Sequence, residues 1–157
     1  MSKTTRATQA LEAAGVAFTL HSYAYDPDAP RIGLHAAEAL GEDPSRVLKT
    51  LMAEVDGKPV CVAIPSDREV SMKKLAAAFG GKAAAMMKAP DAERLTGFVV
   101  GGISPFGQKR AVPTAMEEMA LLEDRVYING GQRGLQVRLD PKHALRAMDG
   151  RAADLIA

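Results

Sequence analysis

The sequence predicts a single mixed α/β domain. Its 157 residues are typical of one domain, and an apolar content of 47% is enough to build a hydrophobic core. About seven strand-like segments are interspersed with short helices, and their spacing is too irregular for a doubly wound sheet. We therefore expect residues 1–157 to form one domain, without an internal linker or repeat.

Hydrophobic periodicity predicts the elements of the first half of the chain. The expected helices are residues 4–14, 33–40 and 71–79, each followed by a glycine, and the expected strands are residues 16–23, 47–55 and 60–64. Asp56-Gly57 lies between the last two strands and is typical of a hairpin turn. Residues 60–64 are apolar throughout, which predicts a strand buried on both faces.

The second half follows the same mixed pattern. A strand near residues 83–87 precedes a helix that begins at Pro90 and ends at Gly97. The expected later strands are residues 98–103, 125–128 and 135–139, and the last helix follows the capping residue Asp140 and ends at Gly150. The segment from Pro113 onward stays ambiguous, because some of its apolar residues have helical spacing.

Charge is unevenly distributed along a chain whose net charge is only +1. Residues 71–112 contain seven lysines and arginines against two carboxylates. This stretch predicts either a surface that binds a polyanion or a solvated basic face. Aromatic residues make up 4% of the chain and tryptophan is absent, which argues against a base-stacking platform for single-stranded nucleic acid.

The N-terminus lacks the apolar core of a signal peptide, and no run approaches the length of a membrane span. Cys61 is the single cysteine, which excludes an internal disulfide and suits a reducing compartment. We expect a cytoplasmic protein with no membrane partner, in which Cys61 is a buried apolar residue rather than a nucleophile.

Familiar catalytic motifs are incomplete. Residues 102–106 miss the nucleophile elbow because Phe106 replaces its second glycine, and residues 102–107 miss the phosphate loop because Gln108 replaces its lysine. The three histidines form no motif that binds a metal. We expect no metal and no cofactor.

Lys49 is the most unusual charged residue. By the two-residue period of a strand, it shares a face with apolar residues of the strand 47–55. It is either an edge-strand lysine that reaches water or a cation at the floor of a cleft, where it could hold a phosphate or a developing negative charge. Tyr23 either contacts a ligand or packs as an ordinary tyrosine. Residues 129–131 form either a binding loop or a hairpin turn.

Residues 100–110, Val-Gly-Gly-Ile-Ser-Pro-Phe-Gly-Gln-Lys-Arg, carry three glycines and a proline after an apolar run. Glycine permits a close backbone approach that a side chain would block. This segment is either a tight turn or a loop that presents bare N–H groups to a ligand.

Together these segments resemble the YbaK-type Cys-tRNA(Pro) deacylases, relatives of the editing domain of bacterial prolyl-tRNA synthetases. The matching segments are His21-Ser22-Tyr23 with Asp26-Pro27, residues 47–51, Thr96-Gly97 with residues 100–109, and residues 127–131 with Arg133-Gly134-Leu135. The match spans nearly the whole chain in the same order, and residues 100–109 are its most specific part.

The resemblance implies a compact domain with a curved or barrel-like sheet flanked by helices. It implies removal of cysteine from mischarged proline tRNA, in which the substrate's own thiol attacks the ester and the enzyme positions it. It assigns catalytic roles to Lys49, Gly101 and Gly102. The substrate-binding residues that it implies are Tyr23, Thr50, Ile103, Ser104 and Asn129.

Two residues depart from the family pattern. Asn129 stands where a serine is common, and Gln136 where an aspartate is common. Prolyl-tRNA synthetase is an expected partner besides tRNA. The alternatives are an editing enzyme for another small aminoacyl group, such as alanyl, and a non-catalytic module that binds aminoacyl-nucleotides or thiols.

Overall fold

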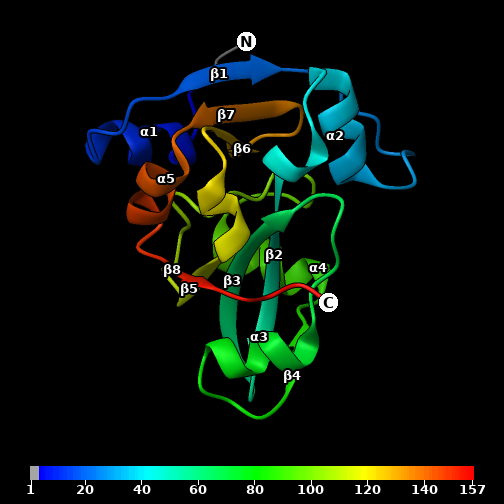
Figure 1. The fold of residues 1–157 in the computed structure, drawn as a ribbon, viewed down its shortest axis with the longest axis vertical. Coiled ribbons are helices and arrows are strands. Elements are labelled where there is room, and N and C mark those ends of the chain that lie inside the picture. The colour runs from blue at the N-terminus through cyan, green and yellow to red at the C-terminus, as the bar shows by residue number, and fades with distance from the viewer. Residues whose placement is uncertain (1–3) are drawn as a thin grey trace.

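The structure, a computed structural model, describes residues 4–157, which form two β-sheets. Residues 1–3, on which the prediction of no signal peptide partly rests, lie outside the described residues. The smaller sheet is antiparallel, in the order β1 (Thr19–Ser22), β7 (Leu135–Leu139), β6 (Val126–Asn129). The larger sheet has the order β4 (Ala84–Met86), β2 (Leu48–Val55), β3 (Lys58–Pro65), β5 (Thr114–Glu117), β8 (Arg151–Ala153). Figure 1 shows the smaller sheet at one end of the molecule and the β2–β3 hairpin extending toward the other.

Hydrophobic clusters join the helices to these sheets. Residues of α1 (Arg6–Ala13) and α5 (Pro141–Ala147) pack with the inner side of the smaller sheet. Residues of α3 (Met72–Ala78) pack against the larger sheet (Figure 1). α2 (Ile32–Leu40) packs through two alanines on the junction between the sheets, and α4 (Ala89–Thr96) follows β4. Two 3₁₀ helices, Pro44–Arg46 and Glu118–Leu122, complete the described elements.

The local signals for turns and caps are confirmed. Val55 pairs with Lys58 around the hairpin turn, and β3 is buried on both faces from Val60 to Ile64. The side chain of Ser71 caps α3 by accepting a hydrogen bond from the backbone N–H of Lys74. Gly97 ends α4 in the left-handed conformation, as a C-terminal glycine stop predicts.

The two sheets meet at the start of β2. Val47 makes an isolated parallel bridge with Tyr127 of β6, whereas β4 pairs with β2 only at Ala53–Val55. Within the described residues, no strand covers that edge of β2 between these two points. This uncovered edge forms one wall of the pocket described below.

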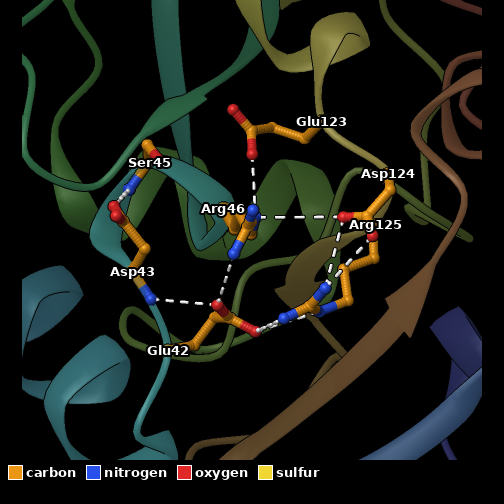
Figure 2. A network of polar contacts seen from close by, with 7 residues as sticks. All are labelled: Glu42, Asp43, Ser45, Arg46, Glu123, Asp124 and Arg125. Carbon is orange, nitrogen blue, oxygen red and sulfur yellow. Dashed lines mark hydrogen bonds and ion pairs between the residues drawn. The ribbon is translucent and has the colours of Figure 1, made fainter.

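A network of charged side chains involves residues that flank the same junction in sequence. Figure 2 shows Glu42 between two guanidinium groups, with Arg46 on one side and Arg125 on the other. Glu42 Oε1 accepts from Arg46 at 3.2 Å, and Glu42 Oε2 accepts from Arg125 Nε at 3.1 Å. Arg46 also donates to Glu123 at 2.8 Å. Because Arg46 directly precedes Val47 and Arg125 closely precedes Tyr127, this network ties together the segments that carry the bridge.

Several element predictions need correction. Residues 98–103 form a loop rather than a strand, because Gly101 has φ 90° and Gly102 donates to Val99 O in a turn. β1 is shorter than the predicted strand 16–23, and the ambiguous segment after Pro113 is β5 followed by a 3₁₀ helix. β8 was not predicted.

The predicted α/β domain with a sheet flanked by helices is confirmed, although the two sheets do not close into a barrel. Among the described residues, no helix has the length and apolar character needed to cross a bilayer.

Candidate functional site

A pocket of about 250 Å³ opens at the uncovered edge of β2. β2 provides one wall, the end of β1 and the β6–β7 pair provide another, and the loop after α4 closes the side. We call this the Lys49 pocket. Its lining residues are Tyr23, Ala36, Val47, Leu48, Lys49, Thr50, Leu51, Val100, Gly101, Ile103, Asn129 and Gln136. Its walls are therefore mainly apolar, with polar groups at a few defined points, as is typical of small-molecule sites.

Lys49 is the one charged residue in this lining set. Its side chain is 22% exposed, and its Nζ lies 3.8 Å from Glu69 Oε1. Glu69 is itself 70% exposed and also pairs with Arg31 at 3.3 Å, so it neutralises Lys49 only weakly. Both interpretations of Lys49 therefore hold in part: it lies on an uncovered strand edge, and that edge lines a pocket.

Two buried polar atoms in the pocket have no hydrogen-bond partner. They are Thr50 Oγ1 on β2 and Gln136 Oε1 on β7. Burial raises the pKa of the nearby Tyr23 phenol above its usual value, and a hydrogen bond from the Gln136 side chain opposes this change. Buried polar groups in proteins are normally paired, so these two atoms mark places where a ligand could bind.

The segment 99–104, which we call the glycine loop, is held by side chains distant in sequence. Asn129 Nδ2 donates to Gly101 O at 3.0 Å, and Arg133 Nε donates to Val100 O at 2.9 Å. Glu93 Oε2 accepts from Val100 N at 2.8 Å. The N–H of Gly101 has no bonding partner within residues 4–157, and Gly101 lines the pocket. The loop thus presents a free backbone donor beside Lys49.

Not all of the predicted site residues line the pocket. Tyr23, Lys49, Thr50, Gly101, Ile103 and Asn129 do so. Gly102 is outside the lining set, its N–H is bonded to Val99 O, and a Cβ there would meet the backbone of Gln132 and Arg133. Ser104 is fully buried and accepts from the N–H of Phe106, so in this structure it shapes the loop.

Asn129 has a role that the sequence did not indicate. Its Oδ1 accepts from the N–H groups of Gly131 and Gln132, while its Nδ2 holds Gly101. Both ends of this amide are therefore used within the protein, and Asn129 positions the glycine loop.

Sequence reasoning also missed pocket residues. Ala36 belongs to no motif, and Leu48 and Leu51 lie in the matching segment 47–51 but were assigned no role in the site. Gln136 could have been found from the sequence, because it is a polar residue at the otherwise apolar start of the strand 135–139. In the sequence, Gln136 otherwise stands out only as a departure from the family pattern.

Other candidates for chemistry lie outside the pocket. Cys61 is fully buried, and burial raises the pKa of its thiol to about 12, so it stays protonated and unreactive near neutral pH. Within the described residues, no three His, Cys, Asp or Glu side chains form a group that could hold a metal ion. The expectation of a site without metal or cofactor stays a prediction.

Comparisons with known proteins show which family the sequence matches. Residues 27–147 match the aminoacyl-tRNA editing domain family. A candidate Cys-tRNA(Pro)/Cys-tRNA(Cys) deacylase of Enterococcus faecalis, EbsC, is 38% identical over 76% of this chain and 73% of its own length. The proline–tRNA ligase of Streptomyces coelicolor is 33% identical over 80% of this chain, which corresponds to only 21% of the ligase.

Solved structures show the same fold. A crystal structure described as that of a candidate trans-editing enzyme for prolyl-tRNA synthetase superposes with a TM-score of 0.81 over 97% of this chain and 95% of that protein, at 24% identity. The crystal structure of the hypothetical protein APE2540 gives a TM-score of 0.83 over 98% of this chain and 100% of its own, at 23% identity. Together with the sequence matches, these findings confirm the predicted resemblance and the predicted class of enzyme, an aminoacyl-tRNA deacylase.

Proposed function

Because the chain belongs to the aminoacyl-tRNA editing domain family, we propose that it removes cysteine from mischarged Cys-tRNA(Pro) in trans. The observation that carries this proposal is the Lys49 pocket, which combines a cation, a free backbone donor and apolar walls in a space suited to a small aminoacyl group. The name of the Enterococcus faecalis relative and the match to a segment of proline–tRNA ligases support cysteine and proline tRNA as the substrate.

The proposed reaction uses a nucleophile that the substrate brings. The cysteinyl Sγ forms a bond to its own ester carbonyl carbon, and the bond from that carbon to the ribose oxygen breaks. The thiol proton passes to the departing ribose oxygen, and water then opens the resulting thiolactone to free cysteine. Holding the thiol beside the ester supplies a large intramolecular advantage, so the pocket contributes mainly orientation.

Lys49 and Gly101 provide the polar part of this orientation. The ammonium group of Lys49 would hold the terminal adenosine or its phosphate near the ester, with Thr50 beside it. The N–H of Gly101 would donate to the carbonyl oxygen as negative charge develops there, in a pocket that partly excludes water. Gly102 is proposed to contribute by allowing the backbone turn at this point rather than by its own N–H, which is already bonded to Val99 O. Tyr23 and Ile103 would contact the aminoacyl group from the facing walls.

The whole of residues 1–157 would act as one editing domain. Its substrate includes the acceptor end of tRNA, and prolyl-tRNA synthetase is a proposed partner. We place it in the cytoplasm, where tRNA is charged.

The Lys49→Ala variant tests the catalytic proposal. Release of amino acid should be measured from Cys-tRNA(Pro), Ala-tRNA(Pro) and seryl-tRNA with the wild type, Lys49→Ala and the control Lys142→Ala, which changes an exposed lysine on α5. We expect cysteine to be released selectively and Lys49→Ala to lose at least about 100-fold in kcat/KM without a change in Tm, because it removes a charge that acts in the transition state. Normal turnover by Lys49→Ala would refute the site assignment.

The same experiment separates the alternatives. The walls of the pocket are apolar, and such walls distinguish a methyl from a slightly larger group by only about 1–3 kcal/mol. Faster release of alanine than of cysteine would therefore indicate editing of a different small aminoacyl group. Binding without turnover of any ester would indicate a non-catalytic module.

A further inference from the structure

Gln136 is a buried polar residue of the Lys49 pocket that lies on a strand rather than on a loop. Gln136 lies on β7, the central strand of the smaller sheet, and pairs with His21 on one side and Asn129 on the other. It is 4% exposed. A buried side chain on a strand paired at both edges has little freedom to turn away toward solvent.

The amide oxygen of Gln136 has no hydrogen-bond partner. Oε1 is buried as an unpaired acceptor inside the pocket, and the same side chain acts on the neighbouring Tyr23 phenol by lowering its pKa. Leaving a buried acceptor unpaired costs about 1–3 kcal/mol, so a bound donor would recover that free energy. Thr50 Oγ1 on the wall formed by β2 is buried and unpaired as well.

The charges of the pocket restrict which donor fits. The lining residues include the cation Lys49 but no carboxylate. A donor that binds here is therefore recognised by neutral oxygen atoms. An aminoacyl ester offers three kinds of donor, which are the α-amino group, a side-chain thiol or hydroxyl, and a ribose hydroxyl.

The α-amino group fits these two acceptors better than the other donors. A thiol is a weak donor, and in the proposed reaction it must be free to approach the carbonyl. A ribose hydroxyl has one proton and can donate to only one of the two atoms. An amine has at least two N–H bonds and can donate to acceptors on two walls at once.

We propose that Gln136 Oε1 and Thr50 Oγ1 form the subsite for the α-amino group of the aminoacyl ester. This inference rests on the proposed function and adds a determinant of specificity to it. The protein would then recognise its substrate as an amino acid through neutral acceptors, independently of how Lys49 and Gly101 act on the ester.

A four-way comparison of enzyme and substrate tests this subsite. Cysteinyl-tRNA(Pro) and 3-mercaptopropionyl-tRNA(Pro), which keeps the thiol but lacks the amine, are each hydrolysed by the wild type and by Gln136→Met. We expect loss of the amine to lower kcat/KM about tenfold for the wild type and less than about threefold for Gln136→Met, because the variant has no acceptor left to lose. Thr50→Val should show the same coupling and serves if Gln136→Met does not fold. Arg138→Gln, an exposed change on the same strand, should behave as the wild type.

The inference would be overturned if Gln136→Met and Thr50→Val each lowered kcat/KM, relative to the wild type, by the same factor for both substrates. The two residues would then act on another part of the substrate. If the wild type hydrolyses neither ester, the proposed function is wrong, and the subsite is tested separately by binding. Calorimetry then compares the affinity of an adenosine that carries cysteine through a stable 3′-amide with that of its analogue lacking the amine. Coupling of the amine to Gln136 in binding would support the subsite, and its absence would refute it.

Discussion

Gly101 illustrates how one residue can be required for two separate physical reasons. Its φ of 90° lies in the region that side chains disfavour, and a Cβ there would overlap the hydroxyl of Tyr25. Tyr25 is held in place because the guanidinium of Arg133 lies 5.3 Å from the centre of its ring. The same Arg133 binds Val100 O, so the tyrosine and the glycine loop form one packed unit.

We therefore predict that Gly101→Ala lowers kcat/KM at least about tenfold, because the loop must move and carry its N–H away from the ester position. Gly80→Ala is the matched control. Gly80 also has a positive φ, 69°, but open space surrounds the position of its Cβ. Gly80→Ala should lose only the stability that the positive φ costs, Gly101→Ala should lose more because of the overlap with Tyr25, and steady-state kinetics should show a defect only in Gly101→Ala. Equal kinetics in the two variants would contradict a role for the loop in catalysis.

At the scale of elements, the start of β2 depends on the charge network around Glu42. Burial by itself would raise the pKa of this carboxyl group. Hydrogen bonds from Asp43 N–H, Arg46 and Arg125 outweigh burial, and the pKa lies below its ordinary value of 4.5. Since Arg46 directly precedes Val47 and Arg125 closely precedes Tyr127, we expect the network to help hold β2, and therefore Lys49, against the smaller sheet.

The lowered pKa predicts how stability depends on pH. The ionised Glu42 contributes stability that is fully present above its unfolded pKa near 4.5 and is lost as the pH falls through the lower folded value. Glu42→Gln should lower the free energy of unfolding by about 1–2 kcal/mol at pH 7. This difference from the wild type should become smaller as the pH falls below the folded pKa of Glu42. Urea unfolding at pH 7 and pH 3.5 measures both effects.

Asp154→Asn provides the control for this prediction. Asp154 pairs with Lys74 on the surface, where both side chains are about half exposed. Such pairs contribute little, so this variant should change stability by less than about 0.5 kcal/mol at either pH. A Glu42→Gln effect no larger than this would show that the network does not stabilise the junction.

At the scale of the whole molecule, the basic residues of the stretch 71–112 lie on several elements, and part of them gather beside α4. All seven cations of residues 71–112 are exposed. Arg94, Lys109 and Arg110 line one shallow hollow beside α4. α4 also carries Glu93, which holds the glycine loop through Val100 N. α4 therefore connects this hollow to the glycine loop, and we expect the phosphates of a bound tRNA acceptor end to contact Arg94, Lys109 and Arg110.

Charge reversal at this surface should weaken tRNA binding in a salt-dependent way. The double variant Lys109→Glu with Arg110→Glu should raise KM for charged tRNA. It should also reduce, by about 1.5 in magnitude, the slope of the logarithm of the binding constant for tRNA against the logarithm of the salt concentration, since each phosphate contact contributes about 0.7–0.9 to that slope. Lys142→Glu with Arg146→Glu makes the same change in net charge on α5. The tRNA affinity of each double variant should be measured by filter binding at salt concentrations from about 50 to about 300 mM, and the two slopes compared. Equal slopes would place the tRNA elsewhere.

The sequence alone determined the elements whose signals are local. The hairpin at Asp56-Gly57, the cap at Ser71 and the glycine ends of α2 and α4 were predicted correctly, because neighbouring residues make those hydrogen bonds. It also predicted the family, since the ordered motif at residues 100–109 is specific, and it singled out Lys49, because a charge on an apolar strand face is unusual.

Only the tertiary structure decided how these parts form a site. Residues 98–103 have the apolar character of a strand, yet their hydrogen bonds go to Glu93, Asn129 and Arg133, whose positions no local pattern reveals. Gln136 became a candidate ligand contact only when its amide oxygen was found buried without a partner. Local patterns specify which backbone conformation a segment prefers, whereas the pairing of groups distant in the chain depends on the packing of the whole fold.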